Sequence, residues 1–213
     1  ISSLKTEINY KLAQILKKNK KKQNKNIEKN FYSCLKLHSQ HEIQIILANH
    51  LVEKKLITKV LKENKLINSL ISLLGPDLEF NSEPELAINI KGSNDDYLVK
   101  KYHQEFWSGV GLSTLLIWIP IILPQNSGGV EIVEGSHKWG HIPHQNREPT
   151  NLPKNIKEKK IEVDLGSALI MTSFTLHRTV KSKVSTPRIA LPIIIRNFYY
   201  PTTGNEDMWN FKK

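Results

Sequence analysis

The feature that most limits how this chain can fold is a change of hydrophobic pattern at Gly75-Pro76. Before it, apolar residues recur at three- and four-residue steps, as on one face of a helix. The two series are Leu4, Ile8, Leu12, Ile15, Leu16 and Ile43, Ile46, Leu47, Leu51, Val52. After it, short β-like runs are separated by Gly, Pro, Asn and Ser. We therefore expect two or three helices over about Leu4 to Leu74, followed by a β-region.

The β-region contains eight candidate strands. They are Leu86–Ile90, Val99–Trp107, Ser113–Ile119, Val130–Val133, Ile161–Val163, Ala168–Thr172, His177–Val180 and Arg188–Phe198. Short strands without long helices between them favour an antiparallel sandwich or barrel, closed as a cupin-like jelly roll, the double-stranded β-helix. With 213 residues and an apolar share of 39%, the chain can bury one core. We predict one domain, with a helical layer over 1–76 packed on a jelly-roll core over 77–213 that carries a metal site.

The formal net charge of +11 suggests a nucleic-acid binder, but the charge is local. Residues 1–66 hold 15 Lys and no Arg against 5 Glu and no Asp, so the rest of the chain is almost neutral. The four arginines of the chain are few for reading bases, a role in which the planar guanidinium exceeds Lys. The composition argues against sequence-specific nucleic-acid binding. It leaves open whether the run Lys17 to Lys22, expected as a solvated helix end or loop, attracts an anionic partner.

Cys34 is the only cysteine, so an intrachain disulfide is excluded. The longest strongly apolar stretch, Leu115 to Leu123, is interrupted by Pro120 and is much shorter than the ~20 residues that a membrane-spanning helix needs. No secretory signal is visible. We expect a cytoplasmic protein.

Two histidines and a carboxylate have the spacing of a metal site. In His103-Gln104-Glu105, an imidazole and a carboxylate two residues apart point the same way if the segment is a strand. His177 starts another predicted strand. Together these three side chains form the ligand set of a 2-His-1-carboxylate Fe(II) site. Arg188 follows past the turn Ser185-Thr186-Pro187, so a hairpin would bring a guanidinium, suited to gripping a carboxylate, beside the metal.

Over about residues 84–200 the sequence resembles the phytanoyl-CoA dioxygenase family of Fe(II)/2-oxoglutarate-dependent oxygenases. The resemblance rests on ordered segments: Tyr102-His103-Gln104-Glu105, the strand Leu115 to Pro120, Gly128 to Lys138 with its Gly135-Ser136-His137-Lys138, Leu176 to Thr179, and Pro187 to Leu191. It implies that His103, Glu105 and His177 bind iron, that Arg188 and Thr179 bind the distal carboxylate of 2-oxoglutarate, and that O₂ is the co-substrate. Trp118 either lines the cosubstrate pocket or is a core aromatic residue.

Two positions depart from the family pattern. Glu105 stands where Asp is commoner, and the turn before the arginine reads Lys181 to Ser185 without the usual Asn. Because related halogenases have a small residue in place of the carboxylate ligand, Glu105 favours hydroxylation. The resemblance thus implies a dioxygenase that hydroxylates a small or carrier-linked metabolite and converts 2-oxoglutarate to succinate and CO₂.

The sequence leaves two other functions open. Two His and a Glu also make a catalytic zinc site, as in a hydrolase or isomerase, although such an enzyme has no need of Arg188. A non-catalytic protein could instead dock an acidic partner through its basic N-terminal helices. His137, His141 and His144 could suggest a second metal, but the family pattern explains their segment as a loop. Prime substrate and oligomeric state are not encoded in any motif that we find.

Overall fold

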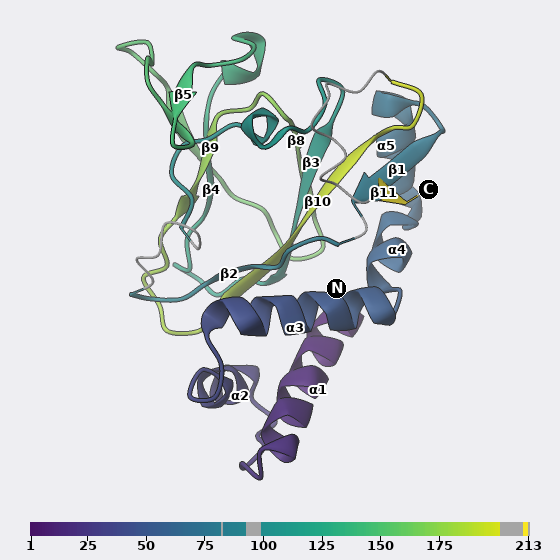
Figure 1. Ribbon diagram of the computed structural model, residues 1–213, viewed down its shortest axis with the longest axis vertical. Helices are drawn as coiled ribbons and strands as arrows, with labels where there is room; N and C mark the ends of the chain where they lie inside the picture. Colours follow the sequence, from purple (N-terminus) through teal and green to yellow (C-terminus); the bar gives the residue numbers. More distant parts are fainter. Residues whose placement is uncertain (82, 93–98, 201–210, 213) are drawn as a thin grey trace.

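The computed structural model describes residues 1–81, 83–92, 99–200 and 211–212. Its β-strands form two sheets that face each other, and the N-terminal helices cover one side of the larger sheet and extend below it (Figure 1). In the described part of the chain, no helix combines the length and the apolar character needed to cross a membrane.

Five helices form, where two or three were expected. They are α1 (Ser2–Lys18), α2 (Ile27–Cys34), α3 (Gln40–Glu53), α4 (Leu56–Leu61) and α5 (Asn64–Leu74). Local capping explains the extra boundaries. The Asn26 side chain accepts hydrogen bonds from the backbone at the start of α2, and Ser39 forms a capping box with Glu42 at the start of α3. Lys55, whose φ of 53° is in the left-handed region, interrupts the helical backbone between α3 and α4.

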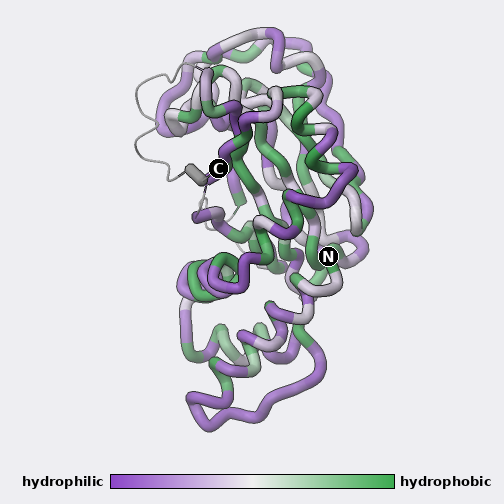
Figure 2. Tube along the Cα trace, turned by 90° about the vertical axis from the view of Figure 1, so that its right-hand side faces the viewer, coloured by the Kyte–Doolittle hydropathy of each residue, from purple (hydrophilic) through white to green (hydrophobic). Residues whose placement is uncertain are grey.

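The predicted apolar face of α1 is confirmed, since all five residues of its series are buried. The lysine run begins in the last turn of α1 and continues into the loop that follows, and its side chains are exposed as expected. This loop lies at the end of the helical layer far from the sheets (Figure 1), and Figure 2 shows it as hydrophilic. The charge is therefore solvated and remote from the β-structure.

The strands are β1 (Leu78–Asn81), β2 (Ala87–Asn89), β3 (Leu115–Ile122), β4 (Gly129–Val133), β5 (His144–Gln145), β6 (Glu148–Pro149), β7 (Glu158–Ile161), β8 (Leu169–Thr172), β9 (His177–Val180), β10 (Arg188–Asn197) and β11 (Phe211–Lys212). The large sheet has the order β11-β1-β10-β3-β8, with β2 also paired to β10. The small sheet has the order β7-β4-β9, and β5 and β6 form a separate hairpin. Every pairing is antiparallel, which confirms the predicted jelly-roll class.

The central strands β3 and β10 are buried on both faces, which explains their nearly continuous apolar runs. One face packs against the helices, through Ile117, Ile119, Leu191 and Ile193. The other face packs toward the small sheet, through Leu116, Trp118, Ala190 and Ile194. Side chains alternate along a strand, so Trp118 and Ala190 share the face between the sheets. The interior between the two sheets is where a ligand cavity can form.

Several strand predictions need correction. The segment Val99–Trp107 is not a strand; it is irregular except for one bridge at His103 and a short 3-10 helix, η1 (Glu105–Ser108). Strand β1 was missed although Leu78–Asn81 alternates apolar and polar residues, because a run of four residues is a weak signal; it pairs with β10 and β11. The two-residue strands β5, β6 and β11 were also missed. The strand expected at Ile161–Val163 ends at Ile161 and begins earlier, at Glu158.

Candidate metal centre

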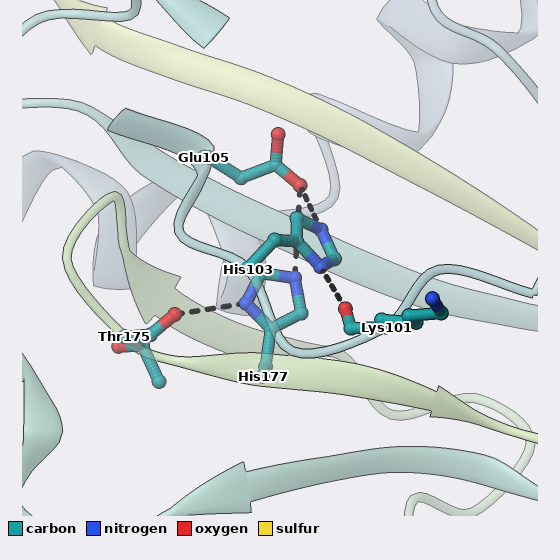
Figure 3. Close-up of polar contacts among 5 residues, drawn as sticks. All are labelled: Lys101, His103, Glu105, Thr175 and His177. Carbon is teal, nitrogen blue, oxygen red and sulfur yellow. Dashed lines mark hydrogen bonds and ion pairs between the residues drawn. The ribbon is translucent and has the colours of Figure 1, made fainter. Parts of the chain in front are cut away.

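The structure brings His103, Glu105 and His177 together between the sheets. One ligand atom from each lies within 4.8 Å of the other two, and all three side chains are buried. Glu105 Oε1 is 3.3 Å from His103 Nε2 and 3.6 Å from His177 Nε2 (Figure 3). In the described part of the chain this is the only group of three His, Cys, Asp or Glu residues with such spacing. The spacing fits a bound metal ion.

Local backbone geometry explains why His103 and Glu105 share a side without lying on a strand. Gln104 between them is extended, with φ at −109° and ψ at 137°, so its neighbours project to one side. His103 forms an antiparallel bridge with His177, and each backbone N–H donates to the carbonyl of the other, at 2.9 and 3.0 Å. The second histidine is thereby placed opposite the first.

The hydrogen bonds of the two imidazoles select their tautomer. His103 Nδ1 lies 2.7 Å from the carbonyl oxygen of Lys101, and His177 Nδ1 lies 2.8 Å from that of Thr175 (Figure 3). A carbonyl oxygen only accepts, so each Nδ1 carries a proton and each Nε2, the atom that would bind a metal, faces Glu105. The same second hydrogen bond orients metal-bound histidines in general.

The charges around the site favour the metal-binding protonation state. Burial lowers the pKa of His103, and the neighbouring His177 acts in the same direction. Burial would raise the pKa of Glu105, but the Lys100 ammonium and the two imidazoles outweigh it and hold that pKa well below its usual range. A neutral imidazole and an ionised carboxylate are the forms that bind a divalent metal.

A cavity of about 80 Å³ opens beside the three side chains. Trp118 from β3 and Thr179 from β9 line it together with the His-Glu-His group. Thr179 is two residues beyond His177 on the same strand, so the two share a face. Two of the three residues that the sequence predicts to contact a cosubstrate, Trp118 and Thr179, therefore line the cavity.

Arg188 is also between the sheets, but not by the predicted hairpin. Strands β9 and β10 belong to different sheets, and the chain crosses from one to the other before Arg188. Arg188 is buried, its Nη1 donates to the Gly129 carbonyl at 3.0 Å, and its Cζ is 5.8 Å from the ring centroid of Trp118. It is not among the residues that line the cavity and instead lies over one of them.

The guanidinium of Arg188 is incompletely satisfied. Its Nε has no hydrogen-bond partner among the described residues, and burial lowers its pKa to about 10. Burying a cation without a counter-charge is unfavourable, so such a group is usually paired or binds an anion. The site thus combines a metal-ligand set with a buried cation that lacks an anionic partner in the described chain.

Two supporting residues were not assigned a role from the sequence. Gln104 is fully buried, and its amide donates to the carbonyls of Gly140 and Phe174 and accepts from the backbone of Ile142. Ser136 Oγ accepts from the backbone N–H of Leu176, next to His177. The one available signal was strand-like alternation, which directs Gln104 away from His103 and Glu105 and into the protein. These bonds fix the loops that carry the ligands.

The histidines considered for a second metal site do not gather. His141 and His144 lie with ring centroids 5.9 Å apart at a steep angle, and His144 stacks on Trp107. His137 is exposed in the short helix η2 (Ser136–Lys138). No second group of three ligands occurs within the described ranges.

No protein-family model and no curated protein matches this sequence. Solved structures match its fold. The non-heme monooxygenase ThoJ, in its apo form, is 16% identical with a TM-score of 0.56, over 92% of this chain and 73% of its own. The epimerase SnoN, in complex with Fe³⁺, alpha ketoglutarate and nogalamycin RO, is 16% identical with a TM-score of 0.56, over 69% and 62%.

EvdO2 from Micromonospora carbonacea var. aurantiaca also matches, at 16% identity and a TM-score of 0.52, over 70% of this chain and 68% of its own. The alignments span 52% of the chain in the ThoJ–Ni complex and 62% of SnoN. This chain therefore corresponds to about half to three-quarters of such proteins. At this identity the likeness establishes the fold alone.

Proposed function

We propose that this chain is an Fe(II)/2-oxoglutarate-dependent dioxygenase of the phytanoyl-CoA dioxygenase type, which hydroxylates a small or carrier-linked metabolite and converts 2-oxoglutarate and O₂ to succinate and CO₂. One observation carries the proposal: two Nε2 atoms and the Glu105 carboxylate converge on one point, and backbone carbonyls accept from both Nδ1 atoms and so direct each Nε2 to that point. Fold likeness to SnoN, whose structure contains Fe³⁺ and alpha ketoglutarate, supports it.

The cosubstrate assignment is supported by the buried cation. Arg188 would bind the distal carboxylate of 2-oxoglutarate, since guanidinium and carboxylate form strong charge-assisted hydrogen bonds. Its Nε has no hydrogen-bond partner among the described residues and could donate to such a carboxylate. Thr179 offers a hydroxyl at the cavity beside the metal ligands, and Trp118, over which Arg188 lies, offers an apolar wall there.

Each residue then has a definable task. His103, Glu105 and His177 would hold iron on one side and leave the other side free for ligands. Iron and 2-oxoglutarate would supply the oxidising chemistry, activating O₂ against the prime substrate. Arg188 and Thr179 would orient the cosubstrate. The three ligands, each at most 9% exposed, would keep bulk water from the reacting atoms.

The proposed reaction is a hydroxylation. Glu105 retains a carboxylate ligand, and a halogenase of this type needs that position free for chloride. The basic end of the helical layer lies away from the two sheets (Figure 1), so its charge is not part of the proposed site.

Anaerobic addition of Fe(II) and then 2-oxoglutarate tests the proposal. A weak visible charge-transfer band should develop in the wild-type chain and vanish in His103→Ala and His177→Ala variants. His137→Ala, which changes an exposed histidine outside the site, should keep the band.

The same experiment separates the alternatives. Metal binding without the band would favour a zinc-type hydrolase or isomerase. Absence of metal binding, with uncoupled succinate formation also absent, would leave the non-catalytic reading and overturn the oxygenase.

A further inference from the structure

A second cavity, of about 250 Å³, adjoins the metal centre. His103 and Lys100 line both this cavity and the one that contains Thr179 and Trp118, so the two cavities share a wall at a proposed metal ligand. Trp107 and the hairpin tip at Arg147 form the other side. A ligand here would lie next to iron without occupying the place proposed for 2-oxoglutarate.

The walls of this cavity are held in place before any ligand binds. Trp107 Nε1 donates to the carbonyl of Ile142 at 3.0 Å, and its ring stacks on His144 with centroids 4.5 Å apart. His144 begins the β5–β6 hairpin, and Glu148 at its other side pairs with Lys101 at 2.6 Å. The hairpin is thus fastened over the cavity at both of its strands.

The lining carries a surplus of positive charge. Lys101 and Glu148 neutralise each other, which leaves Lys100 and Arg147. Within the described ranges no ion pair involves either of these two cations. The Lys100 ammonium is close enough to the metal centre to act on Glu105.

The turn that presents Arg147 is conformationally unfavourable for that residue. Asn146 and Arg147 have φ at 51° and 61°, the left-handed conformation of a two-residue hairpin turn. Glycine is strongly favoured at the second of these positions, and a side chain there costs about 1 kcal/mol. An arginine at this tip therefore lowers the stability of the turn, but it places a cation at the cavity.

We propose that this cavity binds the prime substrate by an anionic group, a carboxylate or phosphate held between Lys100 and Arg147, with the rest of the molecule against Trp107 and its reacting carbon near His103. The assignment of the bound anion to the prime substrate rests on the proposed function. The anion site itself does not rest on the proposed function, because its residues, apart from His103 in the shared wall, take no part in metal binding.

Inorganic phosphate and propionate are the probes. Each is titrated into the metal-free full chain while the Trp107 indole N–H is followed by NMR, assigned by its loss in Trp107→Phe. At least one anion should shift this signal saturably. Lys100→Met and Arg147→Gly should each weaken binding roughly ten-fold, the worth of one charge-assisted hydrogen bond. Lys154→Met, an exposed lysine in a loop outside the cavity, should leave it unchanged.

The tighter probe tells a phosphate ester from a carboxylate. No saturable shift with either, or affinity unchanged in both cavity variants, overturns the proposal. Since Arg147→Gly puts glycine where the turn favours it, misfolding is not expected to confuse the result.

Measurement of 2-oxoglutarate turnover distinguishes failure of the anion site from failure of the dioxygenase function. Compounds that stimulate 2-oxoglutarate consumption should carry the anion, and Arg147→Gly should raise their KM more than it lowers kcat. A neutral substrate whose KM is insensitive to Arg147 would overturn the substrate assignment. Anion binding without any 2-oxoglutarate turnover would remove the dioxygenase function and leave the anion site standing.

Discussion

His103 and His177 face each other as a hydrogen-bonded antiparallel pair, each backbone N–H donating to the carbonyl of the other. Residues so opposed carry their side chains on the same face of the ladder, and here the ring centroids are 4.3 Å apart. A single bridge between β9 and an irregular segment therefore sets the distance between two proposed metal ligands. The site is accordingly sensitive to changes in the loops around this bridge.

Metal binding should stabilise the fold, because the ligand atoms converge only in the folded chain. At a free metal concentration about one hundred times the dissociation constant, the free energy of unfolding should rise by about 2.7 kcal/mol. Thermal unfolding with Fe(II) under anaerobic conditions, or with Mn(II), measures this. The increase should disappear with chelator and in His177→Ala, but persist in His137→Ala; an equal increase in all three chains would place the metal elsewhere.

Arg188→Met should weaken 2-oxoglutarate binding with little loss of stability. The substitution removes a charge that burial disfavours, which offsets the lost hydrogen bond to Gly129. We expect affinity for 2-oxoglutarate to fall roughly ten- to a hundred-fold, as for loss of a charge-assisted contact. Titration monitored by the charge-transfer band measures affinity, and thermal unfolding measures stability. Unchanged affinity in a folded variant would rule out the assigned role.

Gln104→Leu should lower the stability of the fold and the affinity for metal, because it removes hydrogen bonds that hold the loops of the metal site. The amide bonds three backbone groups, and an unsatisfied buried group costs about 1–3 kcal/mol. We expect unfolding free energy to fall by about 2–4 kcal/mol and metal affinity to fall roughly ten-fold or more. Calorimetry and metal titration measure the two effects. Gln104→Glu, which keeps the acceptor for Ile142 but sets a buried carboxylate against the carbonyls of Gly140 and Phe174, should be at least as destabilising. Metal affinity equal to wild type in Gln104→Leu would refute a positioning role.

Gly128→Ala should be more harmful than Gly166→Ala. Both glycines have positive φ, at 81° and 96°, so both substitutions strain the backbone. At Gly128 a Cβ would also lie 2.1 Å from the carbonyl oxygen of Val180, at the end of the strand that carries His177, whereas nothing lies within 4 Å at Gly166. We expect losses of about 3 kcal/mol and 1 kcal/mol in thermal unfolding. Equal losses would mean that the close approach relaxes freely.

The sequence predicts the change from helices to strands and the shared side of His103 and Glu105 well, because both depend on local pattern. The change of periodicity at Gly75-Pro76 separates helices from strands, and the His103-Gln104-Glu105 spacing needs only one extended residue between its ends. Sheet membership is different, since it is decided by contacts far apart along the chain. A hairpin to Arg188 was therefore expected, but the chain changes sheets, and the support given by Gln104 was not assigned.

The lysines at the end of α1 should not attract the substrate. They are exposed in a loop beyond the helical layer, whereas the first half of α1, with Lys5, is the part that lies against β3 (Figure 1). Charges separated by more than the Debye length, about 8 Å at physiological ionic strength, are largely screened. Replacing Lys20, Lys21 and Lys22 by Gln should therefore leave the salt dependence of the substrate's KM unchanged, and Lys100→Met should reduce it. A salt dependence that disappears in the triple variant but persists in Lys100→Met would assign the attraction to the helical layer.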